Sequence, residues 1–302
     1  MPKSVSKPVL KSPYWINEVY SLGYWLKDYG YYPMHWPLYT YMDHGTAPND
    51  RIFPHELETE APLVFKFSPR LANEYKKASK KPVYTLMNPT IHCRRIKKIE
   101  KSPDAKGTIF FPAHSTEVLD DETNWDTFIT GLDNLPEQFK PVDICLHFTD
   151  IVIKGLDKVF EARGYKVFTA GNIEFNEFVE NLYGILRSHK YAMSNLMGSY
   201  AYYSVEMGIP FSLYGPEPLY INRGGEKNIE QGAYTSYKFQ PTYQKAQALF
   251  TGMYTEITPE QKEFVEYELG VHHSISRIKT SYLLYKTYLR NWLIEKRKKS
   301  VG

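Results

Sequence analysis

Polar side chains with catalytic potential follow directly on an apolar run near the middle of the chain. Residues 108–111 read TIFF, which is typical of a buried strand, and after Pro112 the chain presents His114, Ser115 and Thr116. An imidazole can accept or donate a proton near neutral pH, and hydroxyls can donate hydrogen bonds to an anion. The pattern indicates a polar site at the end of this strand, although His114 taken alone could equally be a structural histidine.

A second group of small polar residues follows another short apolar run. Ser194 and Asn195 come after the run at 191–193, and Gly198 and Ser199 stand where a helix is expected to begin. A helix N-terminus carries unpaired N–H groups and a partial positive charge, which makes it a natural seat for a phosphate. The alternative for Ser194 and Asn195 is a simple helix cap, and for Gly198 it is close packing of the helix on a strand.

Three further strand ends carry candidate residues. Gly171 ends the strand-like run 165–171, and the polar stretch 147–150 follows the run that begins at residue 142, where it would cap the next helix. Glu217 comes shortly after the last apolar run, where a carboxylate could hold the ribose of a nucleotide. A solvated loop acid is the alternative for Glu217.

The elements that must position these residues alternate along the chain from residue 107 to residue 215. Strand-like and helix-like runs follow one another about four times, which is the signature of a parallel sheet with helices on both faces. In such sheets ligands bind outside the carboxyl ends of the strands, so the candidate residues should gather at one edge. The expected strands are 108–112, 142–148, 165–171, 191–193 and 209–215, and the expected helices are 124–135, 151–164, 173–190 and 196–208.

The remaining parts of the chain predict two additions to this unit. Strand-like runs at 62–67 and 82–87 flank a short helical run, which indicates a second, smaller α/β unit at the N-terminus. A polar, proline-punctuated linker is expected at 97–104. The predicted domains are 1–102, 103–255 and 256–302, the last being helices that pack across the other two, with a long final helix over 275–299.

The smaller unit also offers a candidate base. Residues 39–42 form a possible short strand that runs into Asp43, His44 and Gly45. A carboxylate or an imidazole at this position could accept the proton of an attacking hydroxyl. Neighbours on an extended chain point to opposite sides, so only one of Asp43 and His44 is expected to face a cleft. The alternative is a plain turn, because the following residues are rich in turn formers.

Composition excludes several classes of protein. The 302 residues carry 37 basic and 34 acidic side chains, and the difference of 37 − 34 = +3 is too small for a typical nucleic-acid binder. The two cysteines, Cys93 and Cys145, argue against a disulfide framework or a cysteine zinc site. The Walker and dinucleotide glycine motifs are both missing. No segment has the apolar length of a membrane span or the apolar core of a signal peptide, so a cytoplasmic location is expected.

Two stretches resemble a known family. FFPAHST at 110–116 and MSNLMGSYAYYSVEMGIPFSLYG at 193–215 are similar to the nucleotide-binding half of GT-B glycosyltransferases of bacterial surface-polysaccharide type, including sialyl- and Kdo-transferase-like enzymes and teichoic acid polymerases. The resemblance covers residues 107–215. It implies a GT-B-like fold, with two Rossmann-like domains and a central cleft.

The resemblance also implies roles for the candidate residues. The donor phosphate would contact His114, Ser115, Ser194, Asn195, Gly198 and Ser199, and Thr116, Gly171 and Glu217 complete the expected donor site. The His44–Gly45 pair resembles one in the teichoic acid polymerases, which favours His44 as the base. Asp43 would correspond to the carboxylate of sialyltransferase-like enzymes. The expected catalytic residues are therefore His44, Asp43 and His114.

These expectations combine into one function with two alternatives. The chain is predicted to be an inverting, metal-independent glycosyltransferase that moves a sugar from a nucleotide-sugar donor to a glycan or glycolipid acceptor, with no cofactor and no Asp-x-Asp metal motif. The alternatives are a CDP-alcohol phosphotransferase and a non-catalytic nucleotide-binding α/β protein. The basic, amphipathic C-terminal helix could rest on an anionic membrane that holds lipid-linked acceptors, at the inner face of the membrane, or it could pack on its own domain.

Overall fold

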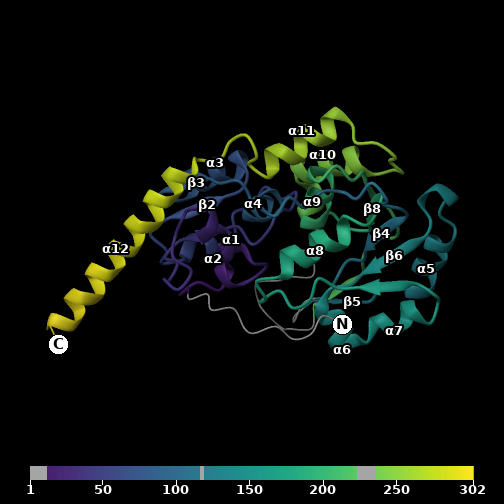
Figure 1. Ribbon diagram of the computed structural model, residues 1–302, viewed down its shortest axis with the longest axis horizontal. Coiled ribbons are helices and arrows are strands. Elements are labelled where there is room, and N and C mark those ends of the chain that lie inside the picture. Colours follow the sequence, from purple (N-terminus) through teal and green to yellow (C-terminus); the bar gives the residue numbers. More distant parts are fainter. Residues whose placement is uncertain (1–11, 116–118, 223–235, 302) are drawn as a thin grey trace.

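Two parallel β-sheets, one from residues 41–85 and one from residues 108–213, organise the molecule (Figure 1). The structure, a computed structural model, describes residues 12–115, 119–222 and 236–301. The smaller sheet has the order β1-β2-β3, and the larger has the order β7-β6-β4-β8-β9. Every pair of neighbouring strands within these two sheets is parallel. The two-unit α/β architecture expected from the sequence, with a parallel sheet in each unit, is thereby confirmed.

The first unit contains the smaller sheet and its helices. Its elements are η1 (Trp15–Glu18), α1 (Leu22–Tyr29), β1 (Tyr41–Met42), α2 (Pro54–Glu58), β2 (Val64–Lys66), α3 (Pro69–Ala78), β3 (Val83–Thr85) and α4 (Pro89–Ile96). Pro69 and Pro89 each begin a helix, where a missing N–H costs nothing because the first helical N–H groups have no intrahelical partner. Ser68 and Asn88 cap the same two helices with their side-chain oxygens.

The second unit contains the larger sheet, and the C-terminal helices follow this unit along the chain. Its elements are β4 (Thr108–Phe111), β5 (Leu119–Asp121), α5 (Trp125–Asp133), η2 (Glu137–Phe139), β6 (Val142–Cys145), α6 (Phe148–Lys154), α7 (Leu156–Glu161), β7 (Lys166–Phe168), α8 (Phe178–Leu186), β8 (Tyr191–Ser194), α9 (Ser199–Glu206), β9 (Phe211–Leu213) and β10 (Tyr220–Asn222). The C-terminal elements are η3 (Ser236–Phe239), α10 (Pro241–Phe250), α11 (Pro259–Glu268) and α12 (Arg277–Val301).

Strand β4 lies at the centre of the larger sheet, and its composition explains why. Ile109 and Phe111 belong to the core on one face of the sheet, and Phe110 belongs to the core on the other face. A strand that is covered on both faces needs a continuous apolar run, which is what the sequence offers here. From β4 the chain steps outward through β6 and β7 on one side, and it then returns to build β8 and β9 on the other. The order therefore reverses between β4 and β8, the point where ligands bind in such sheets.

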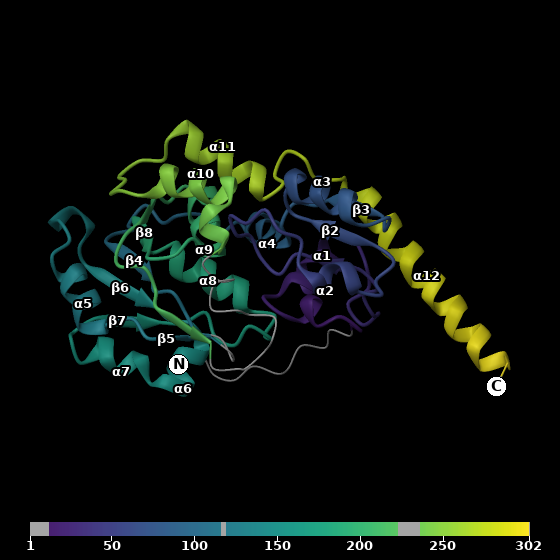
Figure 2. The ribbon, with the colours of Figure 1, turned by 180° about the vertical axis from the view of Figure 1, so that it is seen from behind.

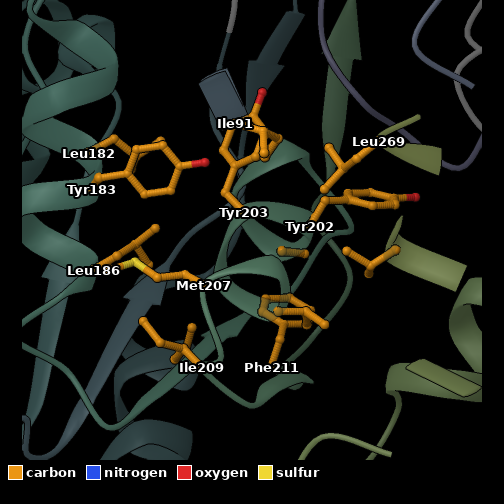
Figure 3. Close-up of a cluster of buried hydrophobic side chains, with 14 of the residues drawn as sticks. Ile91, Leu182, Tyr183, Leu186, Tyr202, Tyr203, Met207, Ile209, Phe211 and Leu269 are labelled. Atoms are coloured by element: carbon orange, nitrogen blue, oxygen red, sulfur yellow. The ribbon is translucent and has the colours of Figure 1, made fainter. Parts of the chain in front are cut away.

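One of the buried hydrophobic clusters contains side chains from both units. Trp25 of α1 and Ile91 of α4 belong to the same buried cluster as Ile109 and Phe111 of the larger sheet. Figure 3 shows the part of this cluster around α9, where Tyr203 lies between Tyr183 of α8 and Tyr202. The two units are thus joined by packed apolar side chains as well as by the chain itself.

The structure corrects two expectations about elements and adds one unexpected pair of strands. The helix expected over 151–164 is two helices, because Gly155 adopts a left-handed φ of 60° that ends α6 and starts α7. The strand expected to reach residue 148 ends at Cys145, since Phe148 already begins α6. The antiparallel pair of β5 and β10 was not expected, because each strand has three residues and neither shows clear alternation.

The C-terminal elements return across both units. Helices α10 and α11 pack against β9 and α9, and α11 also reaches α3 of the first unit, as the two views show (Figures 1 and 2). Gly270 has a φ of 67°, and a Cβ there would lie 2.3 Å from the carbonyl oxygen of Phe67. Helix α12 then packs on α1, with Leu283 and Leu284 in the core of the first unit. The domain boundaries at residues 102 and 255 remain predictions.

Candidate active site

A cavity of about 540 Å³ lies between the two sheets. The first unit contributes the loop after β1, and the second contributes the loops after β4, β6, β7 and β8. These loops all follow the carboxyl ends of parallel strands, where the sequence placed the candidate residues. Of those candidates, the ones that line the cavity are Asp43, His44, His114, Gly171, Gly198 and Ser199.

The two loops at the reversal of strand order are tied together. Strands β4 and β8 pair in register, so that Phe111 lies opposite Ser194. The Oδ1 atom of Asn195 accepts a hydrogen bond of 2.8 Å from the Ala113 N–H, and its Nδ2 atom donates one of 3.0 Å to the carbonyl of Pro216. Asn195 therefore connects three strand-end loops, and it acts on the cavity by holding His114 beside the start of α9.

Ser194 and Ser115 have local partners instead of facing the cavity. The hydroxyl of Ser194 accepts from the Leu196 N–H at 3.1 Å and lies 2.8 Å from the hydroxyl of Tyr200. The hydroxyl of Ser115 accepts from the Asp121 N–H at 3.0 Å. Both side chains are buried, and neither residue lines the cavity. The helix cap considered for Ser194 does not fit this geometry either, because Gly198 is the N-cap of α9 and the Ser194 hydroxyl accepts from a residue that precedes the helix.

One other candidate, Glu217, lies outside the cavity. Glu217 is exposed, forms an ion pair with Lys238 and does not line the cavity. Thr116 falls outside the described residues. Gly171 does line the cavity, with a left-handed φ of 93° in the loop after β7.

The start of α9 opens into the cavity. Gly198 is the N-cap residue, and among the described residues no side chain caps this helix end. A Cβ at Gly198 would lie 2.7 Å from the ring of Tyr200, so any larger residue would push this ring. Gly198, Ser199 and Tyr200 line the cavity, so the start of α9, with its helix dipole, lies beside a space that an anion could occupy.

The loop after β1 is latched to α9 across the cavity. The Thr46 N–H donates to Ser199 Oγ at 2.9 Å, and the same hydroxyl donates to the Thr46 carbonyl at 3.1 Å. Gly45 makes this approach possible, because a Cβ there would lie 2.7 Å from Ser199 Oγ. The Ser199 hydroxyl is thus used to hold His44 in place.

Asp43 is held in a buried charge cluster. Its Oδ1 atom accepts from Lys66 Nζ at 2.7 Å, and its Oδ2 atom accepts from the Phe67 N–H at 2.7 Å. Lys66 Nζ also contacts Glu56 Oε1 at 2.6 Å. Burial and the charge of Asp43 raise the pKa of Glu56. Because both oxygens of Asp43 have partners, this carboxylate is suited to positioning the loop more than to accepting a substrate proton.

His44 is surrounded by aromatic rings yet keeps exposed surface in the cavity. The ring centroids of Trp15 and Tyr20 lie 5.2 Å and 5.0 Å from that of His44. Desolvation is the main cause that lowers the pKa of His44 to about 4, and the nearby His55 and His114 add to it. A neutral imidazole at pH 7 can accept a proton, so His44 has the protonation state that a base requires.

His114 lies in the opposite unit and stacks on a second histidine. Its ring centroid is 4.3 Å from that of His147, with an angle of 16° between the rings. The Nδ1 atom of His114 is 2.9 Å from the carbonyl of Ser115, which can only accept, so Nδ1 carries a proton and Nε2 is left for the cavity. Burial, together with His114, lowers the pKa of His147 to about 3, so the His147 ring is neutral near neutral pH.

His147 illustrates what sequence reasoning missed. It was expected to cap a helix, and its Nδ1 atom does accept from the Thr149 N–H, at 3.4 Å. It also lines the cavity. The only signal for this second role was its position at the end of the strand next to β4. Trp15, Tyr20 and His55 line the cavity as well, and no strand-end rule points to them.

The described residues contain neither a cluster of metal ligands nor a helix that could span a membrane. No group of three or more His, Cys, Asp or Glu side chains is arranged to hold a metal ion in the part of the chain that the structure describes. Within the same residues, no helix combines the length and the apolar character that crossing a membrane requires.

Comparison with known proteins gives limited similarity. No protein-family model matches the sequence. No curated protein matches it either. Among solved structures, a UDP-GlcNAc 2-epimerase from Neisseria meningitidis, bound to UDP-GlcNAc, is similar with 14% identity and a TM-score of 0.38 over 76% of this chain. The wall teichoic acid polymerase TagF is similar with 11% identity and a TM-score of 0.36, also over 76% of this chain. The match spans 62% and 57% of those two chains, less than two thirds of either.

Proposed function

We propose that this protein is an inverting glycosyltransferase that uses a nucleotide-sugar donor. The observation that carries the proposal is the shared cavity, to which one unit brings the neutral imidazole of His44 and the other brings His114 and the open start of α9. A base on one side and an anion seat on the other are the two parts that a single displacement at a sugar carbon needs. The acceptor enters from the first unit in this proposal.

The proposed reaction proceeds in one step. The acceptor hydroxyl attacks the anomeric carbon while its proton passes to His44. The bond between that carbon and the phosphate oxygen breaks on the opposite side, which inverts the configuration. The leaving phosphate receives the electron pair, and its charge is stabilised by the N–H groups at the start of α9. His114 donates to the same phosphate through Nε2 when it is protonated.

Donor turnover tests this proposal directly. Purified protein is incubated with a panel of UDP-, CMP-, GDP- and TDP-sugars, and nucleotide release is measured for wild type, His44→Ala and His114→Ala. His272→Ala is the matched control, because His272 lies on the surface, paired with Glu266 at 3.1 Å. We expect each cavity variant to lose at least about a hundredfold in rate, the usual contribution of acid–base catalysis, and the control to keep its rate.

Three results would contradict the proposal. Full activity in both cavity variants would show that the proposed site is wrong. No nucleotide release from any nucleotide sugar would show that the proposed donor class is wrong. Transfer of a phosphorus-containing alcohol from a CDP-alcohol, seen by phosphorus NMR of the product, would instead identify the phosphotransferase alternative.

A further inference from the structure

Trp15 is an exposed tryptophan held firmly at the rim of the cavity. Its side chain is 51% exposed and lines the cavity, although large aromatic residues usually bury most of their surface. The next two residues of η1 anchor it. Ile16 is fully buried, and Asn17 Nδ2 donates to the Thr40 carbonyl at 2.8 Å. The backbone that carries the indole is therefore anchored, while the indole keeps an uncovered surface.

Tyr20 adds a second ring and a strained backbone. Tyr20 and Ser21 have φ angles of 55° and 57°, in the left-handed region that is unfavourable for residues other than glycine. The conformation is held by hydrogen bonds into the second unit, from the Tyr20 N–H to the Ile173 carbonyl at 2.6 Å and from Ser21 Oγ to the Phe175 carbonyl at 3.0 Å. Strain of this kind gathers at functional sites, where the surrounding structure maintains it.

Trp15, Tyr20 and His44 together form what we call the aromatic shelf. The His44 ring lies between the other two, 5.2 Å from Trp15 with a tilt of 50° and 5.0 Å from Tyr20 at 81°. The edge of Tyr20 thus fixes the imidazole, while the indole extends the surface beyond it. A group lying on Trp15 would be next to His44.

We propose that the aromatic shelf is an acceptor subsite for the pyranose ring of a glycan, which stacks on Trp15 and presents a hydroxyl to His44. This inference rests on the proposed glycosyl transfer and names the substrate of the same site. The C–H face of a pyranose is apolar and slightly positive, which matches the negative face of an indole. Arg51 and Lys66 line the same cavity but neither is part of the shelf, so the shelf suits a neutral ring better than a phosphate.

The donor nucleobase is the competing occupant of such a surface, because bases also stack on aromatic rings. Its phosphates would be held at the start of α9 and at His114, both in the second unit. The shelf belongs to the first unit and contains the proposed base, which must touch the acceptor and not the nucleobase. These positions favour the acceptor.

The test compares ligand binding in three variants. The probes are the methyl β-pyranosides of glucose, galactose, mannose and N-acetylglucosamine, with binding followed by saturation-transfer NMR and titration. The variants are Trp15→Ala, Trp15→Phe and Phe239→Ala, the last as a control because Phe239 is 80% exposed and lies outside the cavity. Affinity for UDP, CMP and GDP is measured in parallel by thermal shift.

We expect at least one pyranoside to bind wild type through its ring C–H protons. Trp15→Ala should weaken this binding about tenfold, equivalent to about 1.4 kcal/mol, Trp15→Phe should weaken it less, and Phe239→Ala should leave it unchanged. Nucleotide affinity should be the same in all variants. Loss of nucleotide affinity in Trp15→Ala, unchanged sugar binding in that variant, or no binding of any pyranoside would overturn the subsite. Failure of the proposed function has a different readout, since wild type would then release nucleotide from no donor.

Discussion

At the scale of single residues, the surroundings of His44 explain its proposed role as a base better than its residue type does. The chain has nine histidines, and His44 is set apart because two aromatic rings and two other imidazoles surround it. These neighbours disfavour the charged form, so the imidazole stays neutral well below the pH at which a free histidine is protonated. A base of this kind remains available across the physiological range.

The pH dependence of catalysis should report this environment. Because burial lowers the pKa of His44 to about 4, the acidic limb of kcat/KM should have its midpoint near 4 and not near 6.5. The measurement is kcat/KM for donor and acceptor from pH 3.5 to pH 8. A limb near 6.5 that persists in His44→Gln would show that another group titrates.

The same shift links His44 to stability. Its pKa is lower in the folded than in the unfolded chain, so the unfolded chain binds the additional proton and acid favours unfolding. This contribution is absent above about pH 6.5 and grows as the pH falls toward 4. The melting temperature is therefore a second measurement on His44→Gln. When the pH is lowered from 7 to 4.5, it should fall less for this variant than for wild type.

At the scale of elements, the latch between the loop after β1 and α9 holds the base in position. It consists of two hydrogen bonds between Thr46 and Ser199, and it depends on the missing side chain of Gly45. The latch connects residues that are 153 positions apart in the chain. The roles of Gly45, Thr46 and Ser199 therefore become clear only when the loop and α9 are considered together.

Gly45→Ala should strain the latch. The new Cβ would lie 2.7 Å from Ser199 Oγ, and we expect a loss of about 1–3 kcal/mol in the free energy of unfolding, measured by urea denaturation. Donor turnover should fall with it, because His44 moves. The cost of Gly45→Ala should shrink in a Ser199→Ala background, where the clashing oxygen is removed.

Gly184→Ala is the matched control for this prediction. Gly184 lies inside α8, and a Cβ there would meet nothing within 4 Å. Alanine is the better helix former by about 1 kcal/mol, so this variant should be neutral or more stable. Equal destabilisation by both substitutions would contradict the role given to the latch.

At the scale of the whole molecule, an ion-pair cluster joins the first unit to α10 and α11, the helices that pack on the second unit. Arg70 of α3 contacts Glu268 of α11 through two nitrogens, at 3.1 Å and 2.7 Å, and Asp50 at 2.7 Å. Asp50 also accepts from the Thr242 hydroxyl of α10 at 2.6 Å. The side chain of Glu268 is only 3% exposed, so its charge depends on Arg70.

Arg70→Met should therefore be strongly destabilising. It leaves a buried carboxylate without its cation, and we expect a loss of about 3 kcal/mol in urea denaturation at pH 7.5. Burial already raises the pKa of Glu268, and the loss of Arg70 raises it further. Because the protonated carboxyl costs less to bury, the deficit should shrink as the pH falls toward 5.

Lys77→Met serves as the comparison for Arg70→Met. Lys77 and Glu74 form a pair of 2.7 Å on the surface of the same helix, and we expect a change below about 0.5 kcal/mol. A similar small change in Arg70→Met would mean that the cluster does not join the units.

The exposed end of helix α12 is a candidate surface for membrane contact, which also concerns the whole molecule. Its last turns project away from the rest of the molecule in both views (Figures 1 and 2). Leu289, Trp292 and Leu293 are exposed there, near the basic Arg290 and Lys296. Apolar anchors next to cations are typical of a surface that binds anionic lipid.

Vesicle binding tests this surface. The full chain should sediment with vesicles that contain phosphatidylglycerol and not with vesicles of phosphatidylcholine alone, and salt should weaken the binding. Trp292→Ser with Leu293→Ser should reduce binding about tenfold or more, since two buried apolar side chains are worth several kcal/mol. Phe239→Ser is the control. Equal binding of all variants, or no preference for anionic lipid, would contradict the proposal.

Local sequence patterns predicted the sheet elements well and the small elements poorly. Strand β4 and helix α5 were predictable because apolar periodicity and capping residues agree at these positions. The break at Gly155 was missed because a glycine within an amphipathic run does not reveal its φ. The pair of β5 and β10 depends on contacts across about a hundred residues, which no local pattern carries.

The sequence by itself determined the parallel α/β class and the gathering of polar residues at the strand ends. Both follow from short-range periodicity and from the geometry that all parallel sheets share. Only the tertiary structure decided which of those residues meet a common cavity. Ser115 and Ser194 turned inward to backbone partners, whereas His147, expected as a helix cap, and Trp15 of η1, which follows no described strand, came to line the cavity. The physical reason is that a side chain's partners, burial and pKa are set by neighbours distant in sequence, such as Lys66 for Asp43.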